Sequence, residues 1–211
     1  AHSDAKLLTS EKGIKVGTGV TVETNGQATY VGIVTASAFK LSDGSNVGGT
    51  DSDAQNNTIG GTNAGDSFNG TNANHNTLFG YDAGTGITSG DYNTAIGSEA
   101  LDNGTQTADA VAIGYRANKN STTGMRNTVV GSQAMLNATD AAYNVAIGYQ
   151  AGRDLASSSH NVAVGYEAGY DTASGGNTTI GSQAGKNLTS GGSNIIIGYN
   201  AQASTTTTSN E

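Results

Sequence analysis

Apolar and polar positions recur with a long, fixed period over most of this chain. A glycine preceded by a large apolar residue, and followed three residues later by alanine, occurs eight times, at positions 80, 97, 114, 131, 148, 165, 181 and 198. Successive glycines are 17 residues apart six times and 16 apart once. Such a period is typical of solenoids, in which each repeat is one coil stacked on the next. We therefore predict a repeat protein.

The residues around each glycine predict a short strand. The segment Val145–Tyr149 is rich in β-branched residues and alternates in size. Successive side chains of a strand point to opposite faces, so Val145, Ile147 and Tyr149 share a bulky face, while Ala146 and Gly148 share an almost bare one. A bare face indicates that another backbone lies close across it. We predict an all-β protein, a parallel β-roll or β-solenoid of about eight 17-residue coils, each with two short strands and two turns.

The repeat divides the chain into three regions. Residues 1–55 predict a small N-terminal β module and a linker, because Asn25-Gly26 between two alternating runs is a strong hairpin signal. Residues 56–203 are the predicted repeat array, and residues 204–211 a C-terminal linker. Asn56 to Gly60 resembles the repeat, but Gly60 lies 20 residues before Gly80 and the alanine is out of phase. We expect an imperfect first coil there.

Two polar positions also follow the period. Asparagine lies four residues before the glycine in every repeat except one, which has Ala110. It predicts either a ladder of stacked amides between coils or a simple turn former. Six residues after the glycine, six of the eight repeats have Asn or Asp, and we expect the second turn there.

The bulky face calls for a partner. A single column would expose a stripe of Ile, Val and Tyr larger than the apolar patches of ordinary monomers. Three columns around a threefold axis would bury all three stripes symmetrically, whereas two columns would also close the contact but leave a flatter seam. We favour a homotrimer, partly because of the resemblance described below, which implies an intertwined one. Its predicted interface residues are Ile96, Ile113, Val130, Ile147, Val164, Ile180, Ile197, Tyr115, Tyr149 and Tyr166. Three tyrosines outside that phase, Tyr92, Tyr143 and Tyr170, are candidate surface contacts.

Composition argues against several classes of function. The chain has a net charge of −8 and no basic stripe, so we expect no nucleic acid partner. No apolar run is long enough to cross a bilayer, so we expect no membrane insertion. The chain has no cysteine, which fits an extracellular or virion protein, although many cytosolic proteins share this feature.

Candidate chemistry is sparse. His2, His75 and His160 do not share a repeat phase and have no neighbouring Cys or Glu at metal-ligand spacing, so we predict no metal site. Calcium-binding solenoids use a Gly-Gly-x-Gly-x-Asp nonapeptide that is absent here. The sets closest to a paired-carboxylate glycosidase site are Glu99, Asp102, Glu167 and Asp171, but acids are common in outer turns. We predict no enzyme, no catalytic residue and no cofactor.

Two further possibilities stay open at this point. Seven Asn-x-Ser/Thr sequons would allow glycosylation in a suitable host. Ice-binding solenoids use flat, regular rows of threonine, but the row three residues before the glycine alternates between threonine and valine, as at Thr94 and Val111. The broken row does not favour ice binding.

The units Asn144–Ala151 and Asn161–Ala168 resemble the Asn-x-Val-Ala-Ile-Gly repeats of trimeric autotransporter adhesin heads. They resemble even more the Asn-Thr-Ala-Ile-Gly-Tyr-x-Ala arrays of phage tail fibres, over about residues 56–203. This resemblance implies intertwined trimers of left-handed parallel β-rolls that bind host surfaces. The 17-residue period is longer than in the usual adhesin head, which enlarges the second turn.

The expected function follows from this resemblance and from the stripe. We expect a structural and receptor-binding segment of a trimeric phage tail fibre, on the virion surface or otherwise extracellular. Its partners would be two further copies of itself and a host glycan or protein receptor. The alternatives are a bacterial trimeric adhesin or surface filament subunit and, from another class, a glycan-degrading fibre enzyme.

Overall fold

The computed structural model describes residues 51–52, 55–68 and 72–203, so the predicted N-terminal module, apart from its last residues, and the C-terminal linker lie outside the described part. Within this part the secondary structure is entirely β, with no helix. The strands are β1 (Asp51–Ser52), β2 (Thr58–Gly60), β3 (Thr77–Phe79), β4 (Thr94–Ile96), β5 (Val111–Ile113), β6 (Thr128–Val130), β7 (Val145–Ile147), β8 (Val162–Val164), β9 (Thr178–Ile180) and β10 (Ile195–Ile197).

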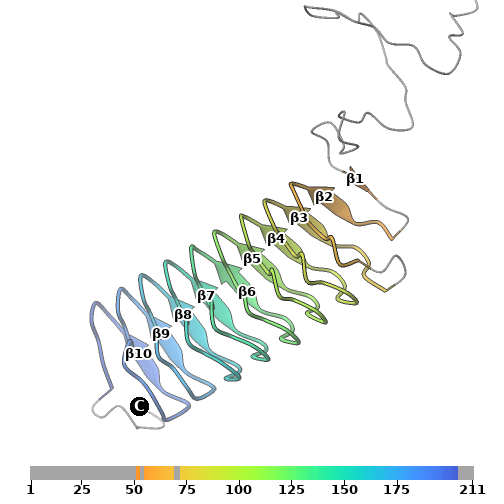
Figure 1. Cartoon of the computed structure of the whole chain (residues 1–211). Helices are drawn as coiled ribbons and strands as arrows, with labels where there is room; N and C mark the ends of the chain where they lie inside the picture. The colour runs from red at the N-terminus through yellow and green to blue at the C-terminus, as the bar shows by residue number, and fades with distance from the viewer. Residues whose placement is uncertain (1–50, 53–54, 69–71, 204–211) are drawn as a thin grey trace, which may run out of the picture. The chain divides into compact units, whose positions relative to one another are not determined.

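Strands β2 to β10 form one parallel sheet in chain order, with a single strand from each coil (Figure 1). Equivalent residues pair between coils, so that Val145 lies beside Val162 and Ile147 beside Val164. The short strand β1 pairs antiparallel with β2 at the start of the stack. The array is therefore the β-solenoid that the repeat predicts.

The second strand that we expected in each coil is absent from the described residues. In its place, the chain after each glycine runs through turns that contain left-handed residues, such as Glu99 (φ 56°) and Leu101 (φ 53°). A left-handed residue interrupts the extended backbone of a strand. The turns of successive coils still bond to each other, as in Leu101 N–H to the Ala117 carbonyl at 3.0 Å. The prediction of two strands per coil was therefore wrong.

The repeat glycine is required by the neighbouring coil along the stack. Gly148 has φ 134°, and a Cβ atom built on it would lie 2.4 Å from the carbonyl oxygen of Gly165. Neither the backbone conformation nor the space permits a side chain. We had assigned this glycine to a bare face across the interior, but its close approach is to the next coil, and the alanines supply the small residues inside.

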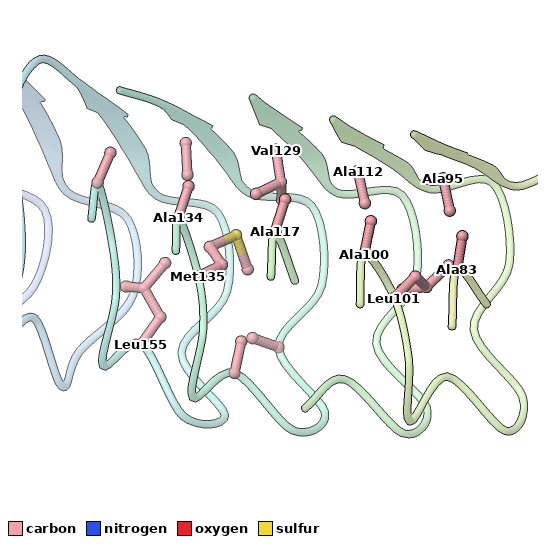
Figure 2. Close-up of a cluster of buried hydrophobic side chains, with 14 of the residues drawn as sticks. Ala83, Ala95, Ala100, Leu101, Ala112, Ala117, Val129, Ala134, Met135 and Leu155 are labelled. Atoms are coloured by element: carbon pink, nitrogen blue, oxygen red, sulfur yellow. The ribbon is translucent and has the colours of Figure 1, made fainter. Parts of the chain in front are cut away.

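The interior is lined by small side chains from both walls of the column (Figure 2). The middle residue of each strand points inward, as Ala95, Ala112 and Ala146 do, and all three are fully buried. The alanine three residues after the glycine faces inward from the opposite wall; Ala100 and Ala117 are examples, also fully buried. Opposing walls of alanine keep the column narrow.

Larger core residues alternate between two positions within a coil. Where the residue four after the glycine is large, the residue seven after it is small, as in Leu101 with Gly104. Where the former is glycine, the latter carries the larger side chain, as in Gly152 with Leu155, and a Cβ on Gly152 would lie 2.8 Å from Leu155 Cδ1. The side chains of the two positions therefore occupy the same part of the interior, and in each coil at most one of them is large.

The asparagine four residues before the glycine forms a buried ladder. Asn144 donates from Nδ2 to the Ser158 carbonyl at 3.0 Å, and its Oδ1 accepts from the backbone N–H of Asn161 at 2.8 Å. The equivalent amides of neighbouring coils are likewise buried, among them Asn76 and Asn127. Of our two interpretations, the ladder is confirmed.

The first coil is more regular than its sequence suggested. Asn57, not Asn56, is the ladder residue, because its Oδ1 accepts from the Asn76 backbone N–H at 2.7 Å. The repeat glycine is then Gly61, with φ 125°, and Ala64 is buried in phase. Gly60 takes the place of the usual isoleucine, and the Phe79 ring occupies the space beside it. The phase that we assigned here was wrong by one residue.

Candidate assembly face

The outward side of the sheet is apolar and carries no charge. We call the strand face the three rows of residues at three before, one before and one after the repeat glycine. In coils β3 to β10 these rows contain only Thr, Val, Ile, Phe, Tyr and Ser. The chain has 26 charged Asp, Glu, Lys and Arg residues, yet none occupies these positions. A large exposed face without charge is unusual on a monomer.

The predicted interface residues all lie on this face, and the structure leaves them partly or well exposed. Ile147 is 40% exposed and Tyr149 is 43% exposed, whereas Ala146, the inward-pointing middle residue of β7, is fully buried. The rings of Tyr149 and Tyr166 stack at 5.4 Å between centroids. The predicted interface residues leave out other members of the face, among them the well-exposed Tyr81, Ile195 and Tyr199, although these share its phase.

A row of exposed side chains borders the strand face where each strand begins. It consists of the residues five before the repeat glycine, and we call it the leading row: His75, Tyr92, Asp109, Arg126, Tyr143, His160, Gly176 and Ser193. Its first six members are exposed and all have left-handed backbone conformations. We had treated His75 and His160 as unrelated in phase, and that was wrong, because both lie in this row. Counting from the glycine would have found it.

Side chains of the leading row contact their neighbours along the column. His75 stacks on Tyr92 at 4.9 Å, and Tyr143 stacks on His160 at 5.0 Å between ring centroids. Between them, Arg126 Nε lies 3.4 Å from Asp109 Oδ2, and Arg126 donates to the Tyr143 hydroxyl at 2.7 Å. Two predicted surface contacts, Tyr92 and Tyr143, therefore belong to an ordered, exposed row.

A second row borders the strand face where the chain turns away from it. This trailing row consists of the residues two after the repeat glycine: Asp82, Glu99, Arg116, Gln133, Gln150, Glu167, Gln183 and Asn200. Arg116 donates to both carboxylate oxygens of Glu99 at 3.1 Å, and Gln150 donates to Gln133 at 2.6 Å. Hydrogen bonds from Lys119 and Arg116 lower the pKa of Glu99, and one from Lys186 does so for Glu167.

The third predicted surface contact lies on the turn side, away from both rows. Tyr170 is partly buried between two cations, with Arg153 at 5.1 Å and Lys186 at 5.6 Å from its ring centroid. Next to it, burial and then the charge of Asp154 raise the pKa of Asp171. The structure does not bring Tyr170 together with Tyr92 and Tyr143.

The described residues show neither a metal-binding cluster nor a membrane-spanning helix. Within residues 51–52, 55–68 and 72–203, no cluster of three or more His, Asp or Glu side chains could hold a metal ion. The same residues include no helix that could span a membrane. Comparison with family models, curated proteins and solved structures gave no match.

Proposed function

We propose that this chain is a segment of a homotrimeric fibre, of the phage tail-fibre type, that attaches to a host surface. The observation that supports it is the uncharged strand face, which is bordered on both sides by polar rows. A polar rim around an apolar centre is the usual anatomy of a protein interface. Three copies around a common axis bury all three strand faces, and the contact closes without leaving an open edge.

Attachment to the host surface belongs to the parts of the column that face outward in such a trimer. The turn side carries the residues that differ most between coils, including Arg153, Tyr170 and Lys186. Threefold symmetry presents each of these residues three times, so weak contacts with a surface glycan or protein add up to firm attachment. The repeat resemblance is the further reason for choosing a virion fibre.

Assembly is tested by native mass. The wild-type chain should have three times the mass of one chain, and Ile147→Asp should give monomers that keep their β-sheet circular dichroism, because a buried unpaired carboxylate is very costly at an interface. Gln106→Asp, which adds the same charge at an exposed turn-side position, is the matched control and should remain trimeric. A monomeric wild type in dilute solution would refute the proposal.

The fibre role itself is tested by genomic context and adsorption. Tail or virion genes beside the coding sequence, together with inhibition of phage adsorption by the purified trimer, would support a virion fibre. A membrane anchor encoded in the same reading frame would instead identify a cell-surface adhesin. Release of new reducing ends from host polysaccharide would contradict the absence of enzymatic activity.

A further inference from the structure

The leading and trailing rows complement each other coil by coil. Reading the residues of each row from the same coil gives His75 with Asp82, Tyr92 with Glu99, Asp109 with Arg116, Arg126 with Gln133, Tyr143 with Gln150, and His160 with Glu167. Each of the six pairs joins a hydrogen-bond donor to an acceptor, and none joins like charges. The one acid of the leading row has the one arginine of the trailing row as its counterpart.

These paired residues cannot meet within one chain. The two rows border opposite edges of the strand face, and the members of each pair are seven positions apart in the chain. A stretch of that length, mostly extended, places them on the order of 20 Å apart. The complementarity can therefore act only between copies.

We propose that the copies stand parallel and in register, with the leading row of one copy against the trailing row of the next. This inference rests on the homotypic assembly proposed above and identifies its contact. The columns of such a ring turn their strand faces inward. The edge at which the strands of one copy begin then lies against the edge at which the strands of the next copy end. The six complementary pairs then form at every junction between copies, and they close the rim around the apolar centre.

Two other arrangements place like charges together. A shift of one coil in one direction sets Asp109 against Glu99 and Arg126 against Arg116. An antiparallel pair centred between Asp109 and Arg126 matches these two residues well, but it sets Asp82 against Glu167. Like charges held side by side at an interface are strongly disfavoured and suppress the wrong alignment. A shift of one coil in the opposite direction creates no repulsion, but it separates Asp109 from Arg116.

Cysteine cross-linking gives a direct test, because the chain has no native cysteine. Tyr143→Cys with Gln150→Cys introduces one thiol in each row at the same coil. The two thiols of one chain are too far apart for a disulfide, which needs Cα atoms within about 7 Å. Under mild oxidation, most of this variant should run as a covalent trimer on a non-reducing gel, and reduction should return the single chain.

Two further pairs serve as matched controls. Tyr143→Cys with Gln133→Cys offsets the thiols by one coil, roughly 4.8 Å, and should cross-link far less. Tyr92→Cys with Tyr143→Cys places both thiols in the leading row, where the antiparallel alignment would join them, and should give no cross-linked species. Efficient cross-linking of either control, in place of the first pair, would overturn the inference.

The possible outcomes separate this inference from the proposed function. A native trimer in which Tyr143→Cys/Gln150→Cys forms no disulfide between chains keeps the fibre proposal and refutes the row pairing. A covalent dimer supports the row pairing and refutes the threefold assembly.

Discussion

The column contains two ladders of asparagine with the same spacing but in different surroundings. The inner ladder, formed by the residues four before the repeat glycine, is buried. In it, the Asn144 side chain donates both to the Ser158 carbonyl and to Asn127 Oδ1. The outer ladder, six residues after the glycine, lies on the turn side, where Asn103 donates to Asn120 at 3.0 Å and Asn120 to Asn137 at 3.3 Å. These asparagines have the same spacing in both ladders, so the ladders differ in how far their side chains are exposed to water.

Water makes the difference between the two ladders. If a bond in the outer ladder is lost, its donor and acceptor can hydrogen-bond to solvent, so its net contribution is small. If a bond in the inner ladder is lost, the partner is left buried without a replacement, which costs the full desolvation penalty of that group. A ladder read from a sequence therefore has no fixed energy until its burial is known.

The largest expected effect comes from breaking the inner ladder. Asn144→Ala leaves the Ser158 carbonyl and the Asn161 backbone N–H without their partner, whereas Asn127 Oδ1 keeps the backbone N–H of residue 144. At roughly 1 to 3 kcal/mol for each orphaned group, with partial relaxation, we expect a loss of about 3 kcal/mol or more in unfolding free energy. Asn120→Ala in the outer ladder should cost well under about 1 kcal/mol. Urea unfolding of both variants compares the ladders directly, and equal losses would refute the role of burial.

A smaller effect of opposite sign is expected at Asn118, which among the described residues is the one fully buried side-chain amide outside the ladder. Asn118 is fully buried, and neither its Nδ2 nor its Oδ1 has a hydrogen-bond partner. Its equivalents in the adjacent coils are Leu101 and Met135. Asn118→Met should therefore stabilise the column by roughly 1 to 3 kcal/mol, because it removes a buried unsatisfied group and adds apolar contact. Thermal unfolding provides the measurement.

The control for that substitution is Asn120→Met, two residues along on the partly exposed outer ladder, where no comparable gain should occur. A lower melting temperature for Asn118→Met would mean that the Asn118 amide is well satisfied in solution.

The interruption of the inner ladder at Ala110 offers a third test. Asn93 Oδ1 accepts from the Ala110 backbone N–H at 3.0 Å, but Ala110 has no amide with which to continue the ladder toward Asn127. Ala110→Asn should supply that amide and stabilise the column by about 1 kcal/mol, the typical net value of one hydrogen bond. Ala110→Leu is the control for added volume and should destabilise. If both variants lose stability alike, this coil cannot hold an amide at the ladder position.

The period of the glycines was enough to predict the fold, because equivalent residues in a solenoid must stack. The inward alanines and the bulky outward row follow from strand alternation at Ala146 and Ile147, and the structure confirms both orientations. The turn side was not predictable in this way. Its backbone depends on left-handed conformations at ordinary residues such as Glu99 and Leu101, which residue type does not announce.

The rows that border the strand face were predictable in principle. His75, Tyr92, Tyr143 and His160 share one distance from the repeat glycine, but they differ in residue type, and a search for recurring letters does not detect them. The contacts that make them one row, such as the stack of Tyr143 on His160, arise only from the stacking of coils. The phase of the first coil was missed for a related reason. Gly60 stands where the other coils have a large apolar residue, and the Phe79 ring of the next coil fills the space beside it.

The smallest expected effect lies where the outer ladder changes from amides to acids. Asn137 donates to Asp154, but the next member of the row is Asp171, so two carboxylates lie side by side. Burial, and then the charge of Asp154, raise the pKa of Asp171 above its ordinary value. A carboxyl group whose pKa is raised in the folded state favours folding while it is protonated. That contribution is lost as the pH rises from the unfolded pKa, about 4, through the folded pKa.

Asp171→Asn continues the row with the residue type found at Asn103, Asn120 and Asn137, and it removes this loss. The variant should match the wild type at about pH 3, and exceed it in unfolding free energy by a fraction of about 1 kcal/mol at pH 7, since the site is only partly buried and solvent screens it. Asn137→Asp should have the opposite effect, because it places a third carboxylate in the row. Urea midpoints measured against pH for the three proteins test both signs. A constant difference between wild type and Asp171→Asn across the whole pH range would show that the titration of Asp171 is not its cause, and that the outer ladder gains from the amide only through its hydrogen bonds.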